Sequence, residues 1–207
     1  MPTITFYNSI NSGHCHRVRL LLKMLKLPYT AVNATAQIRH GEAFRLLNPL
    51  CQVPVITDGD NVIADSNAIL VYLVKKYAPG SHWLPDDPVA AARVEQWLSK
   101  AAGEIRYGPA SARLIKQFAA PEDYPAARAV ADRFLPHLQS YLEDRRWLAA
   151  DQTTIADLAC YGYIASAPEG GISLAPYPAI QHWLARVEAL PGFEPMPQLP
   201  LPEENDR

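Results

Sequence analysis

The chain changes character at a proline-rich stretch that begins at Ala78 and ends at Pro88. Proline removes a backbone donor and fixes φ, so a cluster of prolines interrupts both helices and strands. Before this stretch, β-prone runs alternate with helical patterns, and after it the patterns are helical. The sequence therefore predicts a mixed α/β domain over residues 1–78, a linker over 79–87 and an all-helical domain over 88–207.

The first domain is predicted to follow the order β-α-β, then a helix, then β-β-α. Apolar residues occur on two sides of the segment 17–27, which predicts a helix buried between a sheet and a second layer. An Asp-Gly pair at residues 58–59 separates two strand-like runs and predicts a hairpin. The other predicted elements are strands at 4–7, 29–34, 53–57 and 61–64 and helices at 42–47 and 66–77.

The second domain is predicted to consist of helices with proline-marked breaks. The first runs from Val89 to Ile105 and on to Phe118, with a bend at Gly108-Pro109. The next spans residues 125–144, where Pro136 is expected to start, kink or split it. A capping box at Thr154 and Asp157 starts a third helix, and a last one spans residues 178–190. The Pro- and Glu-rich tail after Phe193 is expected to be an extended arm.

Composition narrows the classes of function. The formal net charge of −2 argues against a dedicated nucleic-acid binder, which usually carries a basic surplus. The longest apolar run, Ala68–Val74, is too short for a membrane span, which needs about 20 residues. The first residues lack a secretory pattern, and three cysteines form no disulfide framework. These features predict a cytoplasmic protein without a membrane partner.

Ser12 lies between the first predicted strand and the first predicted helix. A helix N-terminus favours negative charge, and a serine hydroxyl there is able to donate a hydrogen bond to a thiolate. The alternative is that Ser12 only caps the helix, which serine does often. Neighbouring His14 and His16 have no second cluster of ligands, so no metal site is predicted.

Three further segments supply binding groups to the same domain. A cis bond between Val53 and Pro54 would expose the Val53 backbone to an extended peptide, whereas a trans bond would leave an ordinary edge strand. Asp65 and Ser66 begin a helix, either as a carboxylate site or as a simple cap. The loop residues Arg39 and His40 add positive charge. This charge either holds a second carboxylate of a ligand or is simply solvated. A short acidic thiol peptide would satisfy all four segments.

The chain resembles the cytosolic glutathione transferases over nearly its whole length. Asn48–Pro54 resembles the family's Asn-Pro-x-x-x-Val-Pro segment, and Asp65–Leu73 resembles its Glu/Asp-Ser-x-Ala-Ile-x-x-Tyr-Leu segment. Trp147–Ala149 and Thr154–Asp157 resemble its late capping-box region, and Tyr177–Trp183 and Leu190–Phe193 resemble its last helices. The resemblance implies a thioredoxin-like N-terminal domain, an all-helical C-terminal domain, glutathione as co-substrate, a small electrophile and a homodimer.

The resemblance also implies roles for individual residues. Ser12 would stabilise the glutathione thiolate, and the backbone of Val53 beside Pro54 would pair with the cysteinyl unit. Asp65 and Ser66 would hold the γ-glutamyl end, while Arg39 or His40, with Gln52, would hold the glycyl end. The electrophile is expected near Tyr7, Ile10 and Asn11 in the first domain and near Arg106, Tyr107 and Ala110 in the second.

The sequence leaves three alternatives to a glutathione transferase. Ser12 followed by Arg17-Val18-Arg19 resembles the zeta-type members, which include maleylacetoacetate isomerases, although Ser12-Gly13-His14 departs from the zeta Ser-Ser-Cys. A glutathione-dependent cis-trans isomerase is therefore one alternative. Cys15 occupies the slot of a resolving cysteine, so glutathione-disulfide exchange is a second, and a non-catalytic binding member is a third.

Overall fold

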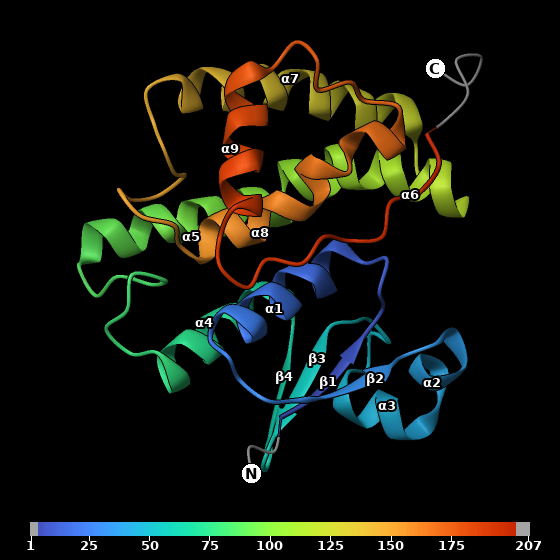
Figure 1. Cartoon of the computed structure of the whole chain (residues 1–207). Helices are drawn as coiled ribbons and strands as arrows, with labels where there is room; N and C mark the ends of the chain where they lie inside the picture. Colours follow the sequence, from blue (N-terminus) through green and yellow to red (C-terminus); the bar gives the residue numbers. More distant parts are fainter. Residues whose placement is uncertain (1–3, 202–207) are drawn as a thin grey trace. The chain divides into compact units, whose positions relative to one another are not determined.

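The computed structural model describes residues 4–201, and these form two compact units (Figure 1). Among them, the first unit contains residues 4–84 together with 191–197, and the second contains residues 85–190 together with 198–201. The division after Leu84 falls inside the predicted linker. Residues 191–197 return to the first unit although they follow the last helix in the sequence.

The first unit is built on a four-stranded sheet with the order β2-β1-β3-β4. Its strands are β1 (Ile4–Asn8), β2 (Thr30–Asn33), β3 (Val55–Asp58) and β4 (Asn61–Ala64). The β1–β2 pair is parallel, and the other two pairs are antiparallel. The register places Phe6 opposite Ile56 and Tyr7 opposite Val55, so the two pairs face opposite sides of the sheet.

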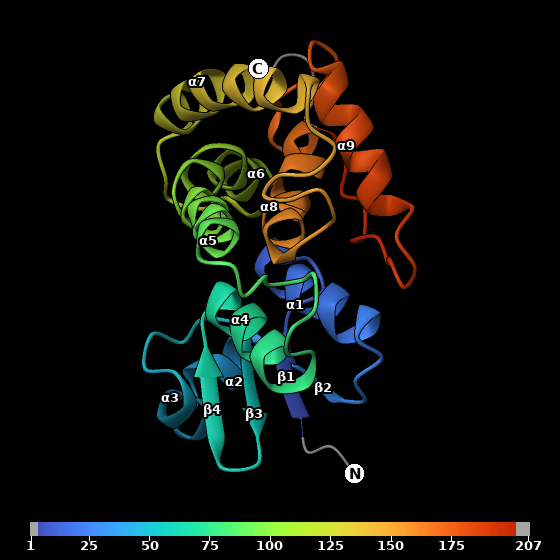
Figure 2. The same cartoon turned by 90° about the vertical axis from the view of Figure 1, so that its left-hand side faces the viewer.

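Helices cover both faces of this sheet (Figure 2). α1 (Gly13–Met24) and α4 (Ser66–Tyr77) pack together on the side of Phe6. α2 (Ala36–His40) and α3 (Glu42–Leu47) follow β2, and Phe44 of α3 meets Tyr7 edge-on at 5.6 Å between ring centroids. Phe44 is buried with Ala34 and Val55 in a small core on that side.

Two helices of the first unit differ from the sequence prediction. α1 begins at Gly13, four residues before the predicted start, because Ser12 caps it and accepts a hydrogen bond from the Cys15 amide. α2 was not predicted, since its five residues carry no apolar period; Thr35 caps it through the Ile38 amide at 3.4 Å. A hydroxyl at the N-cap satisfies an amide that the helix itself leaves unpaired.

Asp58 in the β3–β4 hairpin fastens the sheet to α4. Its carboxylate accepts hydrogen bonds from the Tyr72 hydroxyl (2.9 Å), the Tyr77 hydroxyl (2.5 Å) and the Lys76 ammonium (2.6 Å). Burial acts to raise the pKa of Asp58, but these hydrogen bonds outweigh it and hold the pKa below its ordinary value.

Within the described residues, the second unit is entirely helical. Its elements are α5 (Pro88–Ala102), the π-helical turn η1 (Arg106–Ala110), α6 (Ser111–Phe118), α7 (Tyr124–Glu143), α8 (Ile155–Ala165), the 3-10 turn η2 (Ala167–Gly170) and α9 (Pro178–Glu188). Every residue from Ile155 to Ile164 is buried, so α8 forms the centre against which α5 and α9 pack. The predicted fold class, an α/β domain followed by an all-helical domain, is confirmed.

The start of α8 is fixed by the predicted capping box. The Asp157 carboxylate accepts from the backbone amides of Thr154 (2.9 Å) and Leu148 (3.1 Å) and from the indole N–H of Trp183 (3.0 Å). Asp157 is completely buried, and it therefore ties the loop before α8 and the helix α9 to one point.

Prolines act differently at the two predicted breaks. The bend expected at Gly108-Pro109 takes the form of the π-helical turn η1, which separates α5 from α6. By contrast, α7 continues through Pro136 instead of splitting there.

Gly170 allows η2 to approach α6 closely, because a Cβ on it would lie 2.6 Å from the Arg113 amide nitrogen.

The segment after α9 is held by side chains and is not a free arm. In the first unit, the His16 ring donates from Nε2 to the Glu194 carbonyl at 2.7 Å, and Lys23 forms an ion pair with Glu194. In the second unit, the Leu199 amide donates to Glu169 at 3.1 Å. No helix in residues 4–201 is both long and apolar enough to cross a membrane.

Candidate functional site

A cavity of about 240 Å³ in the first unit collects most of the predicted peptide-binding residues. It lies among the first turns of α1 and α4 and the segment that precedes β3. Predicted residues that line it are Gln52, Val53, Pro54, Asp65 and Ser66. The other lining residues are His14, Asn48, Leu50 and Ala64.

The wall before β3 is shaped by a buried asparagine. The Asn48 side chain donates to the Gln52 carbonyl at 3.0 Å and accepts from the Leu50 amide at 3.1 Å. The loop between them needs a positive φ of 56° at Cys51. The Val53–Pro54 peptide bond is cis, as one of the two sequence interpretations required.

The opposite wall is the beginning of α4. Asp65 caps this helix, and its Oδ1 accepts from the amides of Asn67 (2.8 Å) and Ala68 (3.0 Å). The backbone of Asp65 has φ of 75°, a conformation that costs a non-glycine residue about 1–3 kcal/mol and clusters at ligand clamps. Asp65 therefore fulfils the capping role that the sequence offered, while the buried Ser66 lines the cavity.

Arg17 positions this wall, and sequence reasoning did not select it. Its guanidinium Nη1 donates to the Ser66 hydroxyl at 3.2 Å and to the Asn67 side-chain carbonyl at 2.7 Å. Arg17 is only 1% exposed, so a charge from α1 is held beneath the N-terminus of α4. The available signal was an arginine next to the apolar residues Val18 and Leu21 of this helix, because a buried charge requires partners.

His14 is the second residue that sequence reasoning missed. It lies in the first turn of α1, lines the cavity, and its Nδ1 is 3.3 Å from the Ser66 hydroxyl. From the sequence, this histidine is a candidate only for metal binding. Among residues 4–201, no three His, Cys, Asp or Glu side chains come together as metal ligands would.

Ser12 is at the N-cap of α1, two residues before His14, and does not line the cavity. Its Oγ accepts from the Cys15 amide at 3.3 Å, which uses a lone pair and leaves the hydroxyl hydrogen for another acceptor. Cys15 is fully buried, and the Ser9 amide donates to its sulfur at 3.3 Å. Burial raises the pKa of the Cys15 thiol despite opposing hydrogen bonds and arginine charges.

Arg39 and His40 are at the end of α2, away from the lining of the cavity. His40 is exposed, whereas Arg39 is half-buried. The Nε of Arg39 is buried and has no hydrogen-bond partner in the described part of the chain. The positive charge of Arg39 also acts on the Cys15 thiol beside the N-cap of α1.

The residues predicted near the electrophile have diverse surroundings. Tyr7 packs against the Phe44 core, and Asn11 is half-buried before α1. In the second unit, Arg106 donates to Glu122 at 3.0 Å and to Ser111 at 2.8 Å, while Tyr107 is 62% exposed. The hydrogen bond that Arg106 donates to Glu122 raises the pKa of Arg106 against the effect of burial. Arg106 is thus engaged within its own unit.

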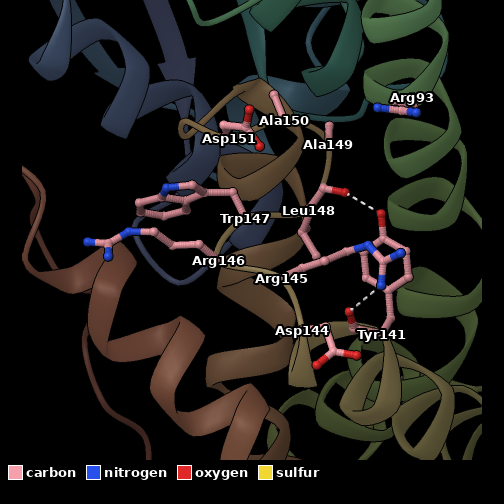
Figure 3. Close-up of a pocket in the computed structure, with 10 residues that line it drawn as sticks. All are labelled: Arg93, Tyr141, Asp144, Arg145, Arg146, Trp147, Leu148, Ala149, Ala150 and Asp151. Carbon is pink, nitrogen blue, oxygen red and sulfur yellow. Dashed lines mark hydrogen bonds between the residues drawn. The ribbon is translucent and has the colours of Figure 1, made fainter.

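A larger cavity of about 530 Å³ in the second unit contains none of the predicted site residues (Figure 3). It lies at the end of α7 and the loop that leads to α8. Its wall is held by Tyr141, whose hydroxyl donates to the Leu148 carbonyl at 2.8 Å and whose ring lies 4.3 Å from the Arg145 guanidinium. The remaining lining includes Arg93 and Arg146, both exposed at the surface.

Comparison with known proteins shows which family both domains match. Residues 11–76 match the family model of the glutathione S-transferase N-terminal domain, and residues 105–191 match that of the C-terminal domain. Human glutathione S-transferase theta-2 is 35% identical over 73% of this chain and 66% of its own length.

Two solved structures are similar over most of the chain. A glutathione S-transferase from Pseudomonas fluorescens has a TM-score of 0.85 at 31% identity, covering 93% of this chain and 98% of its own. A glutathione transferase homologue from Drosophila mojavensis, solved with bound glutathione, has a TM-score of 0.81 at 30% identity, covering 92% and 90%.

Proposed function

Because the chain belongs to the glutathione S-transferase family, we propose that it binds glutathione in the 240 Å³ cavity and transfers its thiolate to an electrophile. The observation that carries this proposal is the cavity itself. It joins the backbone edge at Val53 to the carboxylate site at Ser66, next to the helix start that Ser12 caps.

The γ-glutamyl end of glutathione carries a carboxylate and an ammonium group. The Ser66 hydroxyl and the N-terminus of α4 favour the carboxylate, and Arg17 adds a buried positive charge behind them. Asp65 uses Oδ1 for the cap, and its carboxylate charge favours the ammonium group. The cysteinyl unit pairs with the Val53 backbone in the manner of an added strand.

For the glycyl carboxylate, the structure supports Arg39 over His40. The buried Nε of Arg39, which has no hydrogen-bond partner within residues 4–201, is a donor that a carboxylate would satisfy, and the Arg39 charge acts near the start of α1. Gln52 contributes an exposed amide from the cavity wall. We expect Arg39→Ala to weaken glutathione binding more than His40→Ala does.

The chemical step needs a thiolate at neutral pH, whereas a free thiol has a pKa near about 8.5. The Ser12 hydroxyl retains a hydrogen for the bound sulfur while its oxygen caps α1, so both roles are compatible. The N-terminus of α1 adds a favourable dipole. Each unit by which the thiol pKa falls corresponds to about 1.4 kcal/mol of preference for the thiolate.

Disulfide exchange through Cys15 is the weaker interpretation. Its thiol is fully buried and burial raises its pKa, whereas a reactive cysteine is accessible and has a lowered pKa.

By family resemblance we also propose a homodimer, which light scattering in solution measures directly.

The test is a pH titration of glutathione bound to the wild type, Ser12→Ala and Ser12→Thr, followed by thiolate absorbance. We expect the thiol pKa to be lowered in the wild type and in Ser12→Thr, which keeps a hydroxyl and a cap. In Ser12→Ala it should return toward about 8.5, and turnover at pH 7 should fall with the thiolate fraction, by about tenfold for each unit by which the thiol pKa rises above that pH. An unchanged thiol pKa in Ser12→Ala would exclude Ser12 from the mechanism.

A further inference from the structure

Two side chains of α1, Arg17 and His14, both contact the hydroxyl of Ser66 at the start of α4. Arg17 Nη1 donates to the Ser66 oxygen, and that oxygen is also 3.3 Å from Nδ1 of His14. Because a guanidinium only donates, the Arg17 contact occupies one lone pair of the Ser66 oxygen. The protonation of His14 Nδ1 then determines whether Ser66 or His14 donates the hydrogen bond between them.

The two directions have different consequences for a ligand. When Nδ1 of a neutral His14 is unprotonated, the Ser66 hydroxyl donates its single hydrogen to His14 and has none for a carboxylate. When Nδ1 carries a proton, in the other neutral tautomer or in the imidazolium, His14 donates to Ser66 instead, and the Ser66 hydrogen is released toward the cavity. Of these two forms, a nearby negative charge favours the imidazolium. A ligand carboxylate at Ser66 therefore favours the form of His14 that is protonated at Nδ1.

The charges around His14 decide when it becomes an imidazolium. On α1, the helix N-terminus and Arg17, held through Ser66, both disfavour a second positive charge. On α4, Asp65 supplies one opposing carboxylate at the cavity wall. The third wall contributes the amide or apolar side chains of Asn48, Leu50, Gln52, Val53 and Pro54. The ligand ammonium group would be balanced by Asp65, so the ligand carboxylate at Ser66 would add the negative charge that favours the imidazolium.

We propose that His14 is a proton-coupled positioning residue: it takes up a proton when a γ-glutamyl carboxylate binds at Ser66 and thereby turns the Ser66 hydroxyl toward that carboxylate. This inference rests on the proposed function, because it assumes glutathione in the 240 Å³ cavity. The proton comes from solvent and remains on the imidazole, so no bond of the peptide changes. Glutathione binding then becomes tighter as the pH falls through the range in which histidine titrates.

The probe for the test is S-methylglutathione, which has no thiol proton of its own. Calorimetry in two buffers of different ionisation enthalpy gives the number of protons taken up on binding. For the wild type we expect uptake of a substantial fraction of one proton near neutral pH, and binding about threefold to tenfold tighter at pH 6 than at pH 8.

Two variants of His14 separate the proton from the hydrogen bond. In His14→Asn the amide nitrogen takes the place of Nδ1 as a permanent donor, so we expect binding without proton uptake and without this pH dependence. In His14→Leu the donor is absent, so binding should be weaker than in His14→Asn and equally independent of pH. Circular dichroism of both variants checks that α1 remains folded.

Wild-type binding without proton uptake, or with the same uptake in His14→Asn, would overturn the role of His14 and leave the proposed function standing. Failure of the wild type to bind either S-methylglutathione or glutathione at any pH would overturn the proposed function, and this inference with it.

Discussion

Replacing Asp157 with alanine is expected to destabilise the second unit strongly. This completely buried carboxylate accepts from the backbone amides of Thr154 and Leu148 and from the Trp183 indole. In Asp157→Ala, all three N–H groups remain away from water and lose their acceptor.

The magnitude follows from these three donors. An N–H group left buried without an acceptor costs about 1–3 kcal/mol, so three such groups would cost about 3–9 kcal/mol if they were independent. Removing a buried charge offsets part of this loss, and local rearrangement lets water reach part of the site. We therefore expect the free energy of unfolding to fall by about 3–5 kcal/mol.

Urea denaturation measures this loss as a shift of the midpoint at unchanged slope. The matched control is Asp157→Asn, which keeps one oxygen for Leu148 and Trp183 but presents an N–H₂ group to the Thr154 amide. The expected order of stability is wild type, then Asp157→Asn, then Asp157→Ala. A loss below about 1 kcal/mol in Asp157→Ala, or a reversal of the two variants, would refute the reasoning.

Three further predictions concern other parts of the structure. The lowered pKa of Asp58 contributes stability that is fully present above the ordinary Asp pKa of 3.8 and is lost as the pH falls through the lowered pKa. Asp58→Asn should therefore flatten the acid side of a plot of unfolding free energy against pH. An unchanged plot would contradict this. Gly170→Ala should reduce stability by about 1–3 kcal/mol, because its Cβ would meet the Arg113 backbone; an unchanged melting temperature would show that η2 moves away. Iodoacetamide should modify the half-buried Cys51 before the buried Cys15, as mass spectrometry of partly labelled protein shows, and earlier labelling of Cys15 would contradict its burial and raised pKa.

Local signals predicted the elements whose ends they mark. The bounds of α3 and α4 agree with the predicted helices, since Asn48-Pro49 follows the first and Asp65-Ser66 starts the second. The start of α1 was wrong because apolar periodicity begins only at Val18, whereas the Ser12 cap extends the helix over residues that carry no such pattern. A periodic pattern locates the buried face of a helix but not its capped end.

The candidate site was predictable only in part, because its walls are built by contacts between distant residues. Val53 and Ser66 were selected from the motifs around them, and the structure places both in one cavity. The Arg17–Ser66 hydrogen bond spans 49 positions, and the His14–Ser66 contact spans 52. Contacts between residues so far apart in the sequence produce no periodic pattern. The positioning roles of Arg17 and His14 could therefore be found only from the structure.

The return of residues 191–197 to the first unit has a consequence for the order of events during synthesis. At about 5–20 residues per second, a ribosome needs on the order of 10 s after Leu84 to make this segment. During that delay α1 lacks the Glu194 carbonyl that accepts from His16 and the carboxylate that pairs with Lys23. The first unit is thus begun first but is completed only after the last helix of the second unit has been made, and a nascent chain would hold it unfinished while those helices emerge.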